Sequence, residues 1–287
     1  MADTGFTLNW KKLDPEARIG LPAKKFTGVA GGSGFLLAIA LTVAFYGVLF
    51  PFWQMKSYQF INMFFHGGEE KRSFIPYVTV FLSMWCLALL WIKSKKIKVQ
   101  RRALELQILP ETAGFILSPD NSAVVLNNID GQVYTANNFM VLNRIQKTLA
   151  NLKNIGRVSD VSSVLNDCAI ADEKYIESTY TFTKGLIWAI PVTGFIGTVL
   201  GLSEAVGGFG KVITEGADLS VLKASLSGVT GGLAVAFETT LIALVAALLL
   251  QLLMTLIMQK EEDFMDDCAN FCYQNIIARL KMIDTGD

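Results

Sequence analysis

The sequence is short of the residues on which many enzymes and metal sites depend. It has one histidine, His66, and four cysteines among 287 residues. A single histidine leaves little material for acid–base catalysis, and the four cysteines lack the histidine neighbours of a typical zinc site. The chain also has no P-loop, no GxGxxG turn and no zinc-ligand spacing. These absences argue against an enzyme or a metalloprotein, so we expect neither a cofactor nor a bound metal.

Charged residues are scarce as well. They make up 17% of the chain, against about 25% in a typical soluble domain. The 25 basic residues balance 25 acidic ones, which excludes a polyanion-binding protein steered by bulk positive charge and argues against a nucleic-acid partner. Hydrophobic residues reach 52% and the mean hydropathy is +0.43, which excludes a disordered chain. We therefore expect lipid to be the solvent for much of this protein.

Long apolar runs supply the positive evidence for a membrane protein. Three windows lack charge over about the 20 residues that cross a bilayer, namely Phe35–Trp53, Phe74–Ile92 and Gly185–Ser203. A fourth stretch, Ala224–Gln259, is interrupted only by Glu238. As one helix it would be about 54 Å long, beyond a hydrocarbon core of about 30 Å. We predict an all-α integral membrane protein with four transmembrane helices, two of which extend into the cytoplasm.

Positive side chains indicate the orientation of these spans. They gather before the first span and after the second, at Lys11, Lys12, Arg18, Lys24, Lys25, Lys93, Lys95, Lys96, Lys98, Arg101 and Arg102. We interpret them as positive-inside residues that face lipid headgroups, which places both termini in the cytoplasm and the loop Gly207–Ser227 outside. The expected domains are a cytoplasmic N-terminal segment (1–28), a transmembrane hairpin (29–93), a cytoplasmic helical segment (94–184), a second pair of spans (185–259) and a cytoplasmic C-terminal helix (260–287).

The cytoplasmic segment is expected to be mostly helical. A basic helix continues the second span and ends at Pro110. A polar stretch over 118–132 has turn signals at Asp120-Asn121 and Asp130-Gly131. Helical periodicity marks 137–151, and a further helix runs from about Ser159 into the third span without a breaker. Cys268 and Cys272, one helical turn apart with no histidine nearby, are expected to be small core residues.

Small residues recur on one face of each of the last two spans. The third span carries Pro191, Gly194, Thr198, Gly201, Ala205 and Gly208 at spacings of three and four. The fourth carries Gly232, Ala236, Thr240, Ala243 and Ala247 in the same way. Such stripes let helix backbones approach closely in lipid. Alternatively, two facing stripes, each with one central threonine, leave room between subunits for another helix or for water.

These residues resemble the MotA/TolQ/ExbB proton-channel family. The run Pro191-x-x-Gly194-x-x-Gly197-Thr198-Val199-x-Gly201 is similar to the first family motif. The run from Ala236 to Ala247 is similar to the second, with Thr240 on the polar threonine of the family and Ala243 in place of a common glycine. The resemblance covers roughly 175–280. The four-span layout resembles the MotA branch, whereas the Gly197-Thr198 pair resembles the TolQ/ExbB branch.

The resemblance implies an ion-channel-forming subunit of a membrane motor in the bacterial inner membrane. Five copies would surround two copies of a single-span partner similar to MotB, TolR or ExbD, whose helix carries the ion-binding aspartate. Thr198 and Thr240 would line the path of H⁺ or Na⁺, and ion flow would power motility, envelope transport or another envelope task such as phage defence. Thr193 and Thr239 are further hydroxyls that could help to bind Na⁺, with ordinary hydrogen-bond roles equally open.

The chain also departs from the family pattern. Leu248 and Leu249 follow Ala247 where the family often has a proline, and Val235 stands where the TolQ/ExbB branch carries a glutamate. The acid is instead Glu238, which at 100° per residue lies about 160° around the helix from Thr240. An acid within a span is a candidate for ion handling, and pairing with a neighbouring helix is the alternative.

A different class of function also fits the stripes, namely a non-conducting membrane scaffold that uses glycine-rich packing only for assembly. A neighbouring reading frame for a single-span protein with a membrane aspartate would favour the motor, and its absence would favour the scaffold. A secondary transporter is disfavoured because the sequence shows no inverted repeat.

Overall fold

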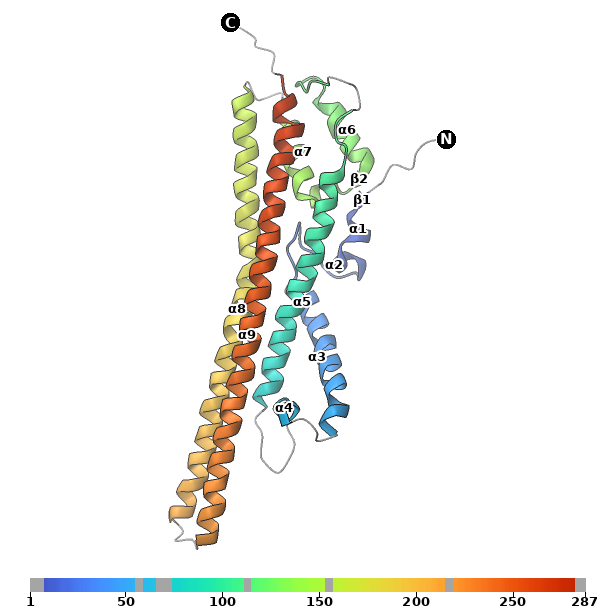
Figure 1. The fold of residues 1–287 in the computed structure, drawn as a ribbon. Coiled ribbons are helices and arrows are strands. Elements are labelled where there is room, and N and C mark those ends of the chain that lie inside the picture. The colour runs from blue at the N-terminus through green and yellow to red at the C-terminus, as the bar shows by residue number, and fades with distance from the viewer. Residues whose placement is uncertain are drawn as a thin grey trace. The chain divides into compact units, whose positions relative to one another are not determined.

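The computed structural model describes residues 8–54, 59–65, 74–110, 115–152, 157–214 and 219–281. Among these, four helices are long and apolar enough to cross a membrane, which confirms the all-α membrane class. They are α3 (Gly31–Gln54), α5 (Ile75–Arg101), α8 (Val158–Thr214) and α9 (Leu219–Asn275) (Figure 1). At 57 residues each, α8 and α9 are more than twice as long as the roughly 20 residues that a membrane crossing needs.

Short elements complete the described chain. The helices among them are α1 (Trp10–Leu13), α2 (Pro15–Arg18), α4 (Gln59–Asn62), α6 (Ser122–Gln132) and α7 (Met140–Ala150). Single 3-10 turns cover Arg102–Glu105, Ala136–Asn138 and Ile277–Arg279. Two strands, β1 (Leu8–Asn9) and β2 (Val133–Tyr134), pair in parallel, with Leu8 opposite Val133.

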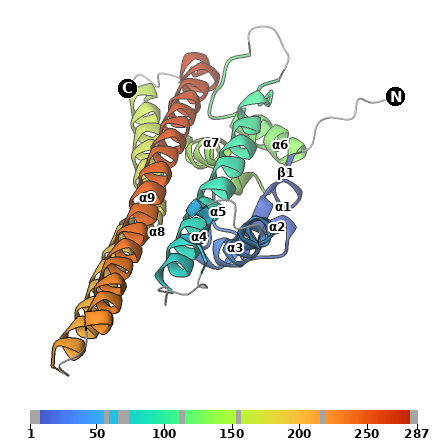
Figure 2. The same cartoon turned by 60° about the horizontal axis from the view of Figure 1, so that its bottom comes forward.

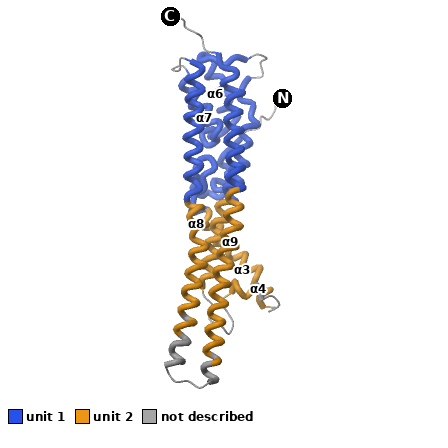
Figure 3. The backbone as a smooth tube through the Cα atoms, turned by 60° about the vertical axis from the view of Figure 1, so that its left-hand side comes forward, with its two compact units in different colours: residues 1–33, 91–181, 256–287 blue, residues 34–90, 182–255 orange. Residues whose placement is uncertain are grey.

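The chain divides into two compact units, drawn in different colours in Figure 3. Unit 1 combines residues 1–33, 91–181 and 256–287, and unit 2 combines residues 34–90 and 182–255. Each unit therefore gathers segments that are distant in sequence. Unit 1 collects most of the three parts that the charge pattern assigns to the cytoplasm, and unit 2 collects most of the apolar windows.

The core of unit 1 is formed around α7 and α6, which lie beside the upper part of α5 in Figure 2. The apolar face of α7 is fully buried, including Met140, Leu142 and Ile145. The N-terminal segment packs against the same core, because the Trp10 ring meets the Phe139 ring edge-on with the centroids 5.3 Å apart. Burial of these side chains fixes the N-terminal segment in place although it contains little secondary structure.

Two predictions about local structure were wrong. The stretch 122–132 forms helix α6 instead of turns, because Val125 and Ile129, four residues apart, are both buried against the core and outweigh the Asp130-Gly131 turn signal. The expected external loop Gly207–Ser227 is largely helical, since α8 continues to Thr214 and α9 begins at Leu219. Residues 215–218 lie outside the described part.

The basic helix after the second span also ends earlier than predicted. Helix α5 stops at Arg101, and its 3-10 extension stops at Glu105, before Pro110. The chain beyond it is held by side chains of α6, because the Asn128 and Gln132 amides donate hydrogen bonds to the Gln107 carbonyl at 3.3 Å and 3.0 Å. These two bonds satisfy a backbone carbonyl that a continued helix would have paired with one of its own N–H groups.

Candidate functional site

In unit 2 the small residues of α8 and α9 meet one another within one chain. A Cβ atom on Gly194 would lie 2.5 Å from the Cβ of Ala243, and one on Gly201 would lie 3.0 Å from the Cβ of Ala236. A Cβ atom on Gly232 would lie 3.0 Å from that of Ala205. At 2.5 Å from the Ala243 Cβ, position 194 has no room for a side chain unless the helices move. The two helix backbones are therefore in van der Waals contact through residues of both stripes.

This contact predicts a strong effect of a single methyl group. We expect Gly194→Ala to lower the free energy of unfolding by about 1–3 kcal/mol, because the new Cβ overlaps Ala243 in a packed interface. Gly185→Ala is the matched control on the same helix, since a Cβ atom there meets nothing within 4 Å. The control should be neutral or stabilising by up to about 1 kcal/mol. Thermal unfolding in detergent distinguishes the two, and equal midpoints would contradict the close contact.

Thr239 and Gly197 form the central contact of the pair. Thr239 is 2% exposed, and its Oγ1 donates a hydrogen bond to the Ala236 carbonyl at 2.8 Å. A Cβ atom on Gly197 would lie 2.6 Å from this oxygen. Gly197 thus leaves the room that the Thr239 hydroxyl occupies.

Thr240 bridges the two helices. Its Oγ1 donates to the Gly194 carbonyl of α8 at 3.0 Å and lies 3.4 Å from the Ala236 carbonyl of its own helix. The side chain is half-buried, whereas Ala243 and Ala247 further along the same face are buried. The hydroxyl hydrogen is therefore engaged inside the chain, and the oxygen lone pairs are the part of Thr240 that can accept a further hydrogen bond.

Thr198 and Pro191 are half-buried positions of α8. The Thr198 Oγ1 donates to the Phe195 carbonyl at 2.6 Å, so its donor is satisfied by its own helix. Pro191 has no N–H, which removes a helix hydrogen bond one turn earlier. Glu238 is half-buried on α9. At 100° per residue it and Thr240 flank buried Thr239 on opposite sides.

A hydroxyl pair lies beside this contact, formed by Thr193 and by Thr79, which the sequence analysis did not single out. Thr79 of α5 is 1% exposed, and its Oγ1 lies 3.2 Å from the Thr193 Oγ1 of α8. Thr193 donates to the Ile190 carbonyl at 2.7 Å, so Thr79 is the donor to Thr193. The available signal was a threonine within the uncharged window of the second span. The site thus consists of the α8–α9 contact together with this polar link to α5.

Unit 1 contains a second polar cluster that the sequence analysis missed. The Lys93 Nζ lies 3.1 Å from the Glu261 Oε2 and 2.7 Å from the Thr179 Oγ1. The Tyr180 hydroxyl donates to the same Glu261 oxygen at 2.6 Å, and the Lys93 ammonium lies 4.1 Å from the Tyr180 ring centroid. Lys93 and Glu261 are 4% and 1% exposed. The expectation that Lys93 faces lipid headgroups was therefore wrong.

Lys96 is likewise inside the protein. Its Nζ lies 2.5 Å from the Glu16 Oε2 and 3.4 Å from the Asp14 Oδ1, and all three residues are at most 1% exposed. Burial raises the pKa of the Asp14 carboxyl above its ordinary value, and the Lys96 charge opposes this shift. A third buried pair joins α7 to α8, where the Arg144 Nη2 lies 2.9 Å from the Asp172 Oδ2. These pairs hold unit 1 together.

The structure bears on metal binding, and comparisons with known proteins bear on the family of the chain. The described residues contain no group of three or more histidine, cysteine, aspartate or glutamate side chains that could hold a metal ion. Residues 137–270 match the model of the MotA/TolQ/ExbB proton channel family. This match covers α7, all of α8 and most of α9, and it includes both small-residue stripes. No curated protein and no solved structure matches this chain.

Proposed function

We propose that this chain is the ion-channel-forming subunit of a membrane motor driven by a proton or sodium gradient, because residues 137–270 match the model of the MotA/TolQ/ExbB proton channel family. The family is a channel family and not an enzyme family. The observation that carries the proposal is the family match over the close-packed α8–α9 pair with its threonines. The work performed would be motility, envelope energisation or a related envelope task.

The proposed assembly contains five copies of this chain around two copies of a single-span partner similar to MotB, TolR or ExbD. The polar groups support the need for a partner. Glu238 is the sole charged residue in the window 224–259, and the window 185–203 has none. A proton relay through threonines alone lacks a group that binds and releases the proton, so an aspartate from another helix would complete it.

The proposed orientation places both termini in the cytoplasm of a bacterial inner-membrane protein. Unit 1 supports the placement of both termini on one side of the membrane, because residues 1–33, 91–181 and 256–287 pack into one compact body. A body that contains the N-terminal segment, the segment between the second and third spans and the C-terminal helix requires all three on the same side of the membrane. An even number of spans meets that requirement.

The proposal predicts which hydroxyls matter for conduction. We expect Thr240→Val and Thr198→Val to lower ion flux by up to about tenfold each. This factor corresponds to the free energy of one lost hydrogen bond to a passing ion or its carrier. Thr42→Val is the matched control, since the Thr42 Oγ1 also donates to a carbonyl of its own helix, at 2.8 Å, but in the first span. Flux is measured in vesicles that contain the chain and its partner. Normal flux in both channel variants would remove the threonines from the path, and normal flux in Glu238→Gln would remove Glu238.

A scaffold without conduction is the second candidate, and one observation favours it. The hydroxyls of Thr198, Thr239 and Thr240 all donate to backbone carbonyls of the same chain. Small residues and satisfied hydroxyls are also what a purely structural helix pair requires. Ion flux distinguishes the two candidates. A scaffold predicts that vesicles with the chain and its partner conduct no more ions than empty vesicles.

A further inference from the structure

Residues 8–30, the described N-terminal segment before the first membrane helix, expose positive charge without exposed negative charge. Its basic side chains are all exposed, and we call them the basic N-terminal surface: Lys11, Lys12, Arg18, Lys24 and Lys25. Over the described residues 8–30, the acidic side chains are Asp14 and Glu16, which are 0% and 1% exposed. Both are turned inward against Lys96. The fold therefore sorts the charges of residues 8–30, in which every exposed charged side chain is basic.

The segment is held rigidly, so its charges are displayed on a fixed scaffold. The Asp14 carboxylate accepts a hydrogen bond from the Glu16 backbone N–H at 3.4 Å and caps α2. Gly20, with φ of +76°, turns the chain back, and the Leu21 N–H donates to the Glu16 carbonyl at 3.1 Å. Trp10 anchors the other end in the core. A flexible polybasic tail would lack these contacts.

The same contacts tie the segment to the start of a membrane helix. The Glu16 carboxylate accepts hydrogen bonds from the Ala30 backbone N–H, at 2.8 Å, and from the Ser33 hydroxyl in the first turn of α3. Lys25 lies six residues before Gly31, where α3 begins, a stretch of at most about 20 Å. The basic N-terminal surface therefore stays within reach of the membrane face that α3 enters.

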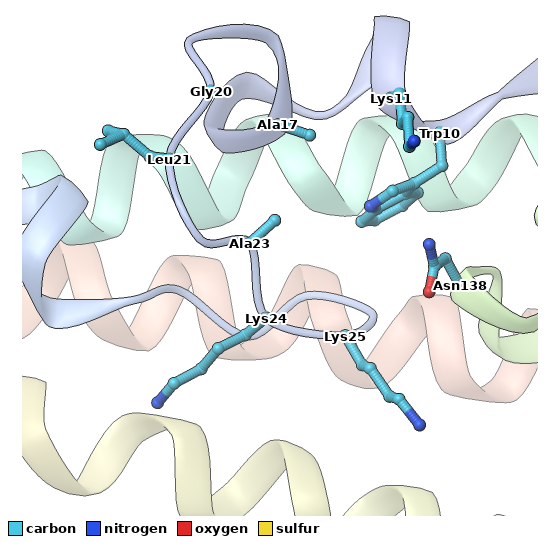
Figure 4. Close-up of a pocket in the computed structure, with 9 residues that line it drawn as sticks. All are labelled: Trp10, Lys11, Ala17, Gly20, Leu21, Ala23, Lys24, Lys25 and Asn138. Carbon is cyan, nitrogen blue, oxygen red and sulfur yellow. The ribbon is translucent and has the colours of Figure 1, made fainter.

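The side chains are arranged for contact with a surface and not for enclosure of one small anion. A shallow hollow of about 320 Å³ is lined by Trp10, Lys11, Lys24 and Lys25 among other residues. Figure 4 shows that the Lys24 and Lys25 side chains extend outward from the loop, away from Trp10. The loop also presents an apolar side chain, Ile19, which is 75% exposed. Spread cations beside an exposed aliphatic side chain match a lipid interface.

We propose that the basic N-terminal surface binds the headgroups of anionic phospholipids and gives the protein a preference for them over zwitterionic lipids. Positive side chains beside a membrane helix attract anionic lipid, and each contributes about a fivefold factor in affinity. The proposal rests on the membrane placement of α3 and not on ion conduction. A wild-type protein with normal ion flux but no preference for anionic lipid would overturn this proposal alone. A wild-type protein with the lipid preference but no flux would overturn only the proposed function.

The test is native mass spectrometry of the full chain in detergent, titrated with phosphatidylglycerol, phosphatidylcholine or inorganic phosphate. We expect wild type to retain phosphatidylglycerol preferentially. The variant Lys11→Gln/Lys24→Gln/Lys25→Gln should lose affinity for phosphatidylglycerol on the order of 100-fold, as expected for three residues. The matched control removes three other exposed lysines of unit 1, as Lys147→Gln/Lys174→Gln/Lys281→Gln, and should change affinity by less than about twofold.

Further arms separate the explanations. The charge-preserving variant Lys11→Arg/Lys24→Arg/Lys25→Arg should bind phosphatidylglycerol as wild type does, which would exclude a folding defect at these positions. Equal retention of phosphatidylcholine, equal loss in the control variant, or binding of inorganic phosphate as tight as that of phosphatidylglycerol would each overturn the proposal. A change in the number of chains per complex without a change in lipid retention would also overturn it, because it would assign the surface to a second copy of the chain.

Discussion

Replacement of Lys96 by methionine should cost about 3–5 kcal/mol of unfolding free energy, because it leaves two buried carboxylates without their cation. Lys96 is 0% exposed, and Asp14 and Glu16 have no other cation within an ion-pair distance among the described residues. The Lys96 Nζ also donates to the Gly28 carbonyl at 2.8 Å. The variant should therefore release the N-terminal segment, which thermal unfolding and increased hydrogen exchange over residues 8–30 would detect.

Two comparisons make this prediction specific. Lys98→Met, an exposed position on the same helix, should change stability by less than about 0.5 kcal/mol. Adding Asp14→Asn and Glu16→Gln to Lys96→Met should recover most of the loss, since no buried charge remains. The loss should also shrink as the pH falls, because burial raises the pKa of Asp14 and a protonated carboxyl needs no cation. A loss in Lys96→Met that is independent of pH and not rescued would contradict the charge-pair account.

Removal of the Glu261 carboxylate is the second change with a large expected effect. Glu261→Met removes the carboxylate from the buried Lys93 ammonium and leaves the Thr179 hydroxyl and the Tyr180 ring beside it. We expect a loss of about 3–5 kcal/mol of unfolding free energy. Because Lys93, Tyr180 and Glu261 lie on α5, α8 and α9, the loss should appear as a lower thermal midpoint with increased exchange in all three helices.

The neighbouring residue provides the control for Glu261. Glu262 is exposed on the same helix, so Glu262→Met should leave the midpoint almost unchanged. The double variant Lys93→Met/Glu261→Met should be more stable than Glu261→Met alone, because it replaces an unpaired buried ion with two apolar side chains. If the double variant is as unstable as the single one, the contribution of Glu261 lies in its packing or in its bond to Tyr180, and the ion-pair explanation is wrong.

The membrane helices were predictable because the bilayer imposes a simple rule on sequence. About 20 consecutive residues with little or no charge mark a span, and all four windows, apart from Phe74 at the start of the second, lie within long helices. Local structure outside the windows was less predictable. Residues 122–132 are helical despite the turn signal at Asp130-Gly131, because Val125 and Ile129 are buried in the core. The sequence alone does not reveal that burial. The expected outer loop is also largely helical, since α8 continues to Thr214 and α9 begins at Leu219.

The basic cluster after the second span shows the main limit of inference from sequence. Charge count correctly marks where the apolar run ends, but it does not distinguish a lysine that faces lipid from one that pairs inside the protein. Lys95 and Lys98 are exposed, whereas Lys93 and Lys96 are buried against acids more than 70 residues away. Only the tertiary fold brings Asp14, Glu16 and Glu261 to these positions, so the pairing has no local signal.

The small-residue stripes were predicted as sequence features, and the structure gives them a definite partner. Gly194, Gly201 and Gly232 pack against the opposite stripe of the same chain. Spacing alone left open whether the stripes face one another or another subunit, because period 3.6 identifies a face and not its neighbour. The role of the threonines in conduction remains a prediction, and it depends on what approaches the oxygen lone pairs of Thr198 and Thr240.

The most direct test of the proposed function is proton or sodium flux into vesicles that contain this chain together with its single-span partner, compared with the same vesicles after an Asp→Asn substitution in the partner helix. The motor-subunit account predicts flux above that of empty vesicles with the aspartate and background flux without it. Flux equal to that of empty vesicles in both preparations, or flux that does not change when the aspartate is removed, would contradict the account.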